Sequence, residues 1–142
     1  MKSLCLSLLV AISLNTCTTD LNNSAWEVSK MRIRFNNSVK TKAINQMIDN
    51  DLKNGSGNMI VVFNDKKIHQ FKGGKIDTTF YIHKIKRKQI TYKDGDKTSQ
   101  IEYDLSNEGK LLKLSYTNGS SMELQRISYS EKLKRKVSDL ED

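Results

Sequence analysis

The stretch KRKQITYKDGDKTSQIEYDLSNEGKLLKLSYTNGSSMELQRIS, residues 86–128, decides the fold of this chain. It contains four segments in which apolar and polar residues alternate, and the junctions between them carry Gly together with Asn or Asp. Alternation with period two is typical of a strand with one buried face, and Gly with Asn or Asp between two such runs is typical of a tight turn. The stretch therefore predicts an antiparallel meander of four strands.

The register of this meander follows from the requirement that paired strands place their apolar residues on the same face. We expect a two-residue turn at 95–96, a four-residue loop at 106–109 and a three-residue loop at 117–119 or 118–120. Ile101 then lies opposite Ile90 on one side and opposite Leu114 on the other. The predicted apolar face carries Ile90, Tyr92, Ile101, Tyr103, Leu105, Leu112, Leu114, Tyr116, Met122, Leu124 and Arg126. The opposite face is polar, so we expect a sheet with one buried face and one solvent-exposed face.

Four more strand-like segments precede this stretch, at 24–35, 58–64, 67–72 and 76–83. The first of them changes parity at Ser29-Lys30, which predicts a β-bulge. Of the junctions between the later segments, only the one near Lys84-Ile85 lacks turn residues. Eight antiparallel strands in chain order close naturally into an up-and-down barrel, because closure leaves no unpaired edge. We therefore predict an all-β fold in which residues 24–128 form one eight-stranded barrel.

Two helices are expected outside the strands. Ser38 can cap a helix between the first two strands, and Gly55 lies just beyond its end. Its apolar residues fall on one stripe at helical spacing: Val39, Ala43, Ile44, Met47, Ile48 and Leu52. The second helix would lie in the basic tail, residues 129–142, with Leu133, Val137 and Leu140 at helical spacing. This tail can dock on the barrel, lie on an anionic membrane surface or fray.

The N-terminus has the composition of an export signal. Lys2 precedes an uncharged apolar run at 4–14, which is shorter than the roughly 20 residues of a membrane-spanning helix. Leu14-Asn15-Thr16-Cys17 resembles the lipobox of bacterial lipoproteins, which implies a signal peptide at 1–16, a lipid on Cys17 and a polar tether at 17–23. Ordinary cleavage without a lipid is the alternative. Both imply export, and the lipid implies a membrane anchor in the bacterial cell envelope, as in an outer-membrane lipoprotein facing the periplasm or the surface.

Two further positions carry a resemblance to lipocalins. Lipocalins open their first strand with Gly-x-Trp, and an Arg on or after the last strand packs over that indole. Ser24-Ala25-Trp26 and Arg126 stand in these places, with Ser24 replacing Gly. The chain thus resembles the lipocalin-like, calycin-type domains of small bacterial lipoproteins, which implies that Trp26 and Arg126 close the barrel. It also implies a small hydrophobic or amphipathic molecule inside the barrel.

The sequence offers little chemistry for catalysis. The chain has two histidines, His69 and His83, and its two cysteines are Cys5 and Cys17. A two-residue Gly73-Gly74 turn would place His69 opposite Thr78 and pointing inward, more in the manner of a core residue than of a ligand contact. We expect no enzyme, no metal site and no cofactor. The residues expected to line a ligand site are Tyr92, Tyr103, Tyr116, His69, Phe80 and Leu114.

Charge does not identify the partner. The net charge of +8 comes from basic residues spread along the chain, and the short basic runs have no interleaved aromatic residues of the kind that stack on single-stranded nucleic acid. We therefore expect no nucleic-acid partner. The leading hypothesis is a non-enzymatic exported lipoprotein that binds a small hydrophobic molecule in its barrel. The alternative is a protein-binding, inhibitor-like module that uses its loops and has a filled core.

Overall fold

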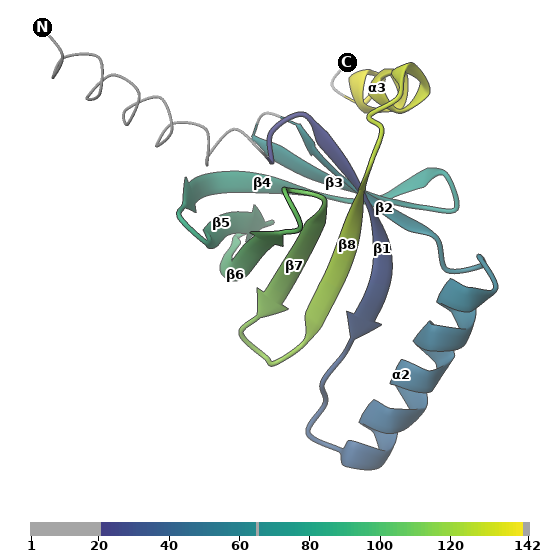
Figure 1. The fold of residues 1–142 in the computed structure, drawn as a ribbon. Coiled ribbons are helices and arrows are strands. Elements are labelled where there is room, and N and C mark those ends of the chain that lie inside the picture. Colours follow the sequence, from purple (N-terminus) through teal and green to yellow (C-terminus); the bar gives the residue numbers. More distant parts are fainter. Residues whose placement is uncertain (1–20, 65, 141–142) are drawn as a thin grey trace, which may run out of the picture.

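A computed structural model describes residues 21–64 and 66–140, and eight antiparallel strands in chain order close into one barrel within them (Figure 1). The strands are β1 (Ser24–Arg32), β2 (Met59–Asn64), β3 (Lys67–Lys72), β4 (Lys75–Lys86), β5 (Gln89–Asp94), β6 (Lys97–Ser106), β7 (Leu111–Tyr116) and β8 (Ser121–Ile127). Helix α2 (Ser38–Lys53) connects β1 to β2, and helix α3 (Glu131–Ser138) follows β8. The predicted fold class is confirmed.

Much of the predicted register is confirmed. Ile90 pairs with Ile101 across a two-residue turn, and β1 carries its bulge between Val28 and Lys30. The last hairpin has a three-residue loop at 117–119, closed by a hydrogen bond of 2.9 Å from the Tyr116 amide to the Ser120 carbonyl. The pattern of one apolar and one polar face was therefore sufficient to set these pairings.

The β6–β7 pairing differs from the prediction by two residues. Tyr103 pairs with Leu114, and Ile101 with Tyr116, because the loop occupies 107–110 rather than 106–109. Asn107, Glu108 and Gly109 all have positive φ, at 52°, 56° and 77°. A shift of two residues leaves every side chain on its predicted face, so the partners were wrong and the faces right.

The turn after β4 and two bulges within it, at Asp77 and at His83, were not predicted. The turn into β5 is Arg87-Lys88, and Lys88 has a φ of 63°, although neither residue is a usual turn former. Near the start of β4, Asp77 is an extra residue in the ladder with β3. His69 therefore pairs with Thr79, and the predicted pairing with Thr78 is wrong.

The barrel interior holds the main hydrophobic core. The buried core residues are Leu21, Trp26, Val28, Val61, Phe63, Ile68, Ile90, Ile101, Tyr103, Leu112, Leu114, Met122 and Leu124. Leu21 is only 2% exposed, although the sequence placed it in a polar tether at 17–23. The fold therefore begins three residues earlier than predicted.

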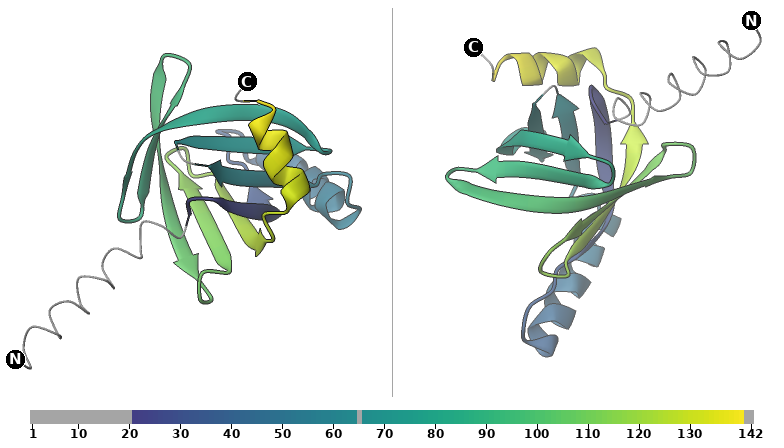
Figure 2. Two further views of the ribbon diagram at one scale, coloured as in Figure 1. Left: turned by 90° about the horizontal axis from the view of Figure 1, so that it is seen from above. Right: turned by 90° about the vertical axis from the view of Figure 1, so that its left-hand side faces the viewer.

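Helix α3 lies across the outside of β1, β2 and β3 (Figure 2). Its inward residues Leu133 and Val137 pack on Ala25, Val62 and Phe71 in a second apolar cluster. The Ser130 hydroxyl accepts a hydrogen bond from the Leu133 amide and caps the helix. Of the three states left open for the basic tail, docking on the barrel is the one observed.

Candidate functional site

The barrel interior is nearly full. A cavity of about 50 Å³ lies among the side chains of the interior. Its walls are formed by Val61, Phe63, Ile68, Gln70, Phe80, Ile90, Tyr92, Ile101, Leu114 and Tyr116. Sites for drug-sized molecules usually measure about 300–1,000 Å³, whereas a single water needs about 10–15 Å³. The interior therefore has room for a few water molecules and not for a lipocalin-type ligand.

The predicted inward tyrosines do lie inside the barrel. Tyr92 and Tyr116 border the remaining space, and Tyr103 is 7% exposed within the core. The ring of Phe80 meets that of Tyr92 edge to face, with centroids 5.1 Å apart and planes at 75°. These contacts make the rings part of the packing, as expected of aromatic pairs in a core.

Burial raises the pKa of Tyr116 to about 12, with a smaller contribution from the neighbouring Tyr92. Removal of a hydrogen-bonding solvent disfavours the charged phenolate, so the hydroxyl stays protonated at neutral pH. Tyr116 is consequently a hydrogen-bonding group of the interior and not a base.

His69 does not lie in the interior, and its predicted inward position is wrong. It pairs with Val62, which belongs to the cluster under α3. The ring is 1% exposed, and its Nδ1 lies 3.0 Å from the Thr79 hydroxyl. The bulge at Asp77 explains the error, because it puts Phe80 on the inner face while His69 stays on the outer one.

Trp26 and Arg126 meet at one end of the barrel. They are directly paired between β1 and β8, and the guanidinium carbon lies 5.3 Å from the centre of the indole ring. The indole Nε1 donates a hydrogen bond of 2.7 Å to the Ser24 hydroxyl, which itself donates to the Leu21 carbonyl. The expected contact is confirmed, and Ser24 supplies an acceptor that glycine would lack.

Helix α2 is attached to the barrel by polar contacts and by Leu52, which packs against the core. Three inner residues, spaced four apart, bond to the end of β1 and to the residues after it in antiparallel order. Asp49 accepts from Arg32 at 2.7 and 3.1 Å, and Asn45 both accepts from the Ile33 amide and donates to its carbonyl. Thr41 similarly bonds to the amide and carbonyl of Phe35. The side chains of α2 thus supply hydrogen-bond partners to the backbone of Ile33 and Phe35, which a neighbouring strand would otherwise supply.

The other flank of α2 exposes apolar residues. We call Val39, Ala43 and Met47 the α2 strip; Val39 is 77% exposed and Met47 60%. None of the described residues of α2 is buried, and the helix extends away from the barrel (Figure 1). The sequence predicted one apolar stripe along this helix. It did not show that half of the stripe, the three residues of the α2 strip, is exposed instead of packed on the barrel. The polar residues at four-residue spacing on the inner flank were the available signal.

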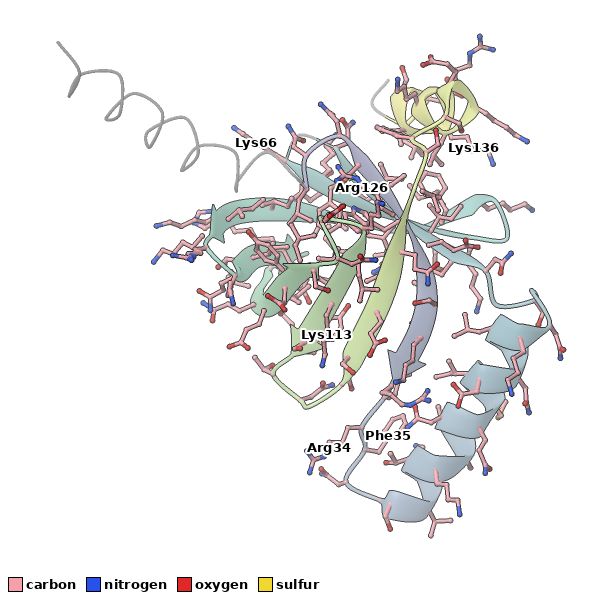
Figure 3. All side chains as sticks on the ribbon, in the orientation of Figure 1. Arg34, Phe35, Lys66, Lys113, Arg126 and Lys136 are labelled. Carbon is pink, nitrogen blue, oxygen red and sulfur yellow. The ribbon has the colours of Figure 1, made fainter. Side chains whose placement is uncertain are left out.

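Basic residues surround the start of the α2 strip. Phe35 is 37% exposed, and the Lys40 ammonium lies 4.7 Å from its ring centre. Figure 3 shows Arg34 and Phe35 between the end of β1 and the start of α2. Apolar side chains with cations beside them form a surface suited to an amphipathic acidic partner.

Other candidate features give less. Among residues 21–64 and 66–140, no three acidic, histidine or cysteine side chains lie close enough together to hold a metal ion. Cys17 lies outside the described residues. No helix in the described part of the chain has the length and apolar character needed to cross a membrane.

No protein-family model, curated protein or solved structure matches the chain.

Proposed function

We propose that this chain is an exported, lipid-anchored, non-enzymatic protein-binding module of the bacterial cell envelope. In this proposal the barrel is a filled, lipocalin-like scaffold, and α2 presents the contact surface. The observation that carries it is the interior volume of about 50 Å³, which favours protein binding over a small ligand held in the barrel.

The α2 strip is the proposed contact surface. The partly buried Leu52 packs α2 against the core, but no residue of this 16-residue helix is fully buried, and its exposed Val39 and Met47 cost solvation energy that a partner would recover. Arg34, Lys40 and Lys42 are exposed nearby. We therefore expect the partner to offer an apolar strip edged with acidic residues, as an inhibited hydrolase could.

The export part of the proposal rests on sequence. Residues 1–16 have the composition of a signal peptide, and Cys17 follows a lipobox-like segment. Substitution of Cys17 with Ser is expected to release the protein from the membrane fraction of the producing cells. Unchanged fractionation after a high-salt wash, which screens attachment by charge alone, would remove the lipid anchor from the proposal.

Binding can be tested with a matched pair of variants of the full chain. Cross-linking in the native envelope followed by quantitative capture should enrich a defined partner with the wild type. Val39→Asp with Met47→Asp should lower its recovery at least about tenfold, because charge in the centre of an interface is poorly tolerated. Thr98→Asp, at an exposed position on the barrel wall, should bind as the wild type does.

Native mass spectrometry of the purified protein tests the small-ligand alternative. The filled scaffold predicts the mass of the chain and its lipid alone. A further co-purifying small molecule would overturn the filled-barrel proposal and favour the ligand-binding one.

A further inference from the structure

The hairpin of β4 and β5 carries the densest group of exposed cations in the described chain. The ladder between β3 and β4 ends at Tyr81, so residues 84–86 of β4 pair with β5 alone. This part of the hairpin and its turn contain four exposed basic residues, which are Lys84, Lys86, Arg87 and Lys88. Lys88 lies 3.5 Å from Asp104, and both side chains are more than half exposed. Glu102 and Asp104 lie beside Arg87 and Lys88, and four cations against these two carboxylates leave the hairpin with a net positive charge at the solvent.

The hairpin lies at the end of the barrel where the chain enters. In an up-and-down barrel successive connections alternate between the two ends. The start of β1 and the β4–β5 turn therefore share one end, and α2 leaves from the other. Lys66 and Arg126 are seen in Figure 3 on the side away from Arg34 and Phe35.

More cations lie at this end. Lys66 and Lys110, in the two other connections there, are also exposed. We define the basic end as Lys66, Lys84, Lys86, Arg87, Lys88 and Lys110. The opposite end also carries exposed cations, among them Arg34, Lys40, Lys42, Lys72 and Lys75, but these are spread over α2, the segment before it and the β3–β4 turn, whereas four cations of the basic end lie within five consecutive residues.

We propose that the basic end docks on an anionic lipid surface, so that the barrel stands on the membrane with α2 directed away from it. This inference rests on the lipid anchor of the proposed function. Cys17 precedes Leu21 by four residues, which span at most about 14 Å. A tether that short keeps the basic end near the surface, within reach of its potential, which decays over about 8–10 Å.

The charge and the anchor are complementary in this arrangement. A lipid chain holds the protein at the bilayer but does not orient it, whereas a cluster of cations on one end favours a single orientation over anionic headgroups. The same orientation leaves the α2 strip free for a partner. In this arrangement one end of the barrel contacts the lipid surface and the other end contacts the partner.

The test uses the full chain carrying Cys17→Ser, so that the lipid makes no contribution. Cosedimentation is measured with vesicles of phosphatidylcholine alone and with vesicles containing about one third phosphatidylglycerol. We expect binding to the anionic vesicles that exceeds binding to the neutral ones. Lys84→Glu, Lys86→Glu and Arg87→Glu together should weaken it by about 10- to 100-fold.

A charge-matched variant at the opposite end serves as the control. Lys42→Glu, Lys53→Glu and Lys75→Glu change the net charge by the same amount at exposed positions. The loss of binding to anionic vesicles in this variant should be less than about one third of the loss in the hairpin variant. The three substituted positions would face away from the lipid. Equal losses in the two variants would show a response to net charge alone and would overturn the proposal.

Two further outcomes also overturn it. One is the absence of any preference for anionic vesicles. The other is aggregation of the hairpin variant without a change in lipid binding, which would assign the lysines to protection of an open strand edge. Fractionation of the wild type against Cys17→Ser after a high-salt wash decides the anchor separately, because salt screens the charge contribution, so failure of the orientation and failure of the anchor remain distinguishable.

Discussion

Ser24 links two parts of the closed end of the barrel. Its hydroxyl accepts from the Trp26 indole at 2.7 Å and donates to the Leu21 carbonyl, and the residue is 2% exposed. A buried indole N–H without an acceptor is costly, so the serine stabilises the buried position of Trp26. The contact also explains why Leu21, before the first strand, is ordered in the core.

Substitution of Ser24 with Ala should lower the free energy of unfolding by about 1–3 kcal/mol, because the indole N–H then loses its acceptor in a dry environment. Denaturant unfolding followed by Trp26 fluorescence measures the change. Ser128→Ala, at an exposed position, should change stability by less than about 0.5 kcal/mol. Equal effects of the two substitutions would contradict the role of Ser24.

Tyr116 should make the stability of the protein sensitive to alkaline pH. Its pKa is raised from 10.0 to about 12, chiefly by burial. Between these values the unfolded chain loses the phenolic proton and the folded one keeps it, so folding is progressively disfavoured as the pH rises. The contribution is fully present below pH 10 and disappears as the pH passes 12.

Between pH 9 and pH 11 the wild type should lose about 1.4 kcal/mol more unfolding free energy than Tyr116→Phe, which has no titrating hydroxyl at this position. Urea unfolding at the two pH values gives the difference. Parallel curves for the two proteins would mean that the hydroxyl titrates as it does in solvent.

At the scale of elements, the two helices differ in what holds them. Helix α3 has eight residues and buries Leu133 and Val137 against the barrel, whereas α2 has sixteen and buries none of them. Packing of an apolar face provides most helix stability in proteins, so the shorter helix is the more firmly docked. The bonds of Thr41, Asn45 and Asp49 compensate in α2 by fixing its direction.

Turn geometry explains which elements could be predicted. The alternation along 86–128 fixed the strands and their faces because period two carries through every hairpin. Two errors fall at turns that contain non-glycine residues with positive φ, which are Lys88 in one turn and Asn107 and Glu108 in the other. Composition gave no signal for the turn at Lys88, and so the start of β5 was misplaced. The loop near Asn107 was predicted from its composition, but its position was wrong by one residue, which changed the partners of β7.

Lys88 should be a site where glycine stabilises the protein. Its φ of 63° places a side-chain-bearing residue in the left-handed region, which costs about 1 kcal/mol relative to glycine. Lys88→Gly should therefore raise the unfolding free energy by up to about 1 kcal/mol in thermal unfolding. Arg87→Gly, at the neighbouring position without a positive φ, should stabilise nothing. A gain at Arg87 and none at Lys88 would contradict the turn as described.

For the whole molecule, the closure of the barrel could be predicted from the sequence, whereas the volume left inside it could not. Eight strands of the right parity predicted a closed barrel with tyrosines inside, and both are observed. The side on which His69 lies depends on one extra residue, Asp77, which alternation alone does not reveal. The volume left inside depends on how some twenty side chains interlock, and small differences in packing decide it. The candidate site therefore had to come from the structure.

A filled barrel should acquire a binding site when one large side chain is removed. Phe80 borders the remaining space and packs on Tyr92, so Phe80→Ala should cost about 3 kcal/mol or more and enlarge the space to the size of a benzene ring. Benzene should then raise the melting temperature of this variant, because a ligand that binds only the folded state stabilises it. The wild type should not respond. Tyr81→Ala, at the adjacent position that is 57% exposed, should resemble the wild type in both respects. A benzene-dependent rise in the wild type itself would show that its interior already admits small apolar molecules, and the barrel could no longer be regarded as a scaffold alone.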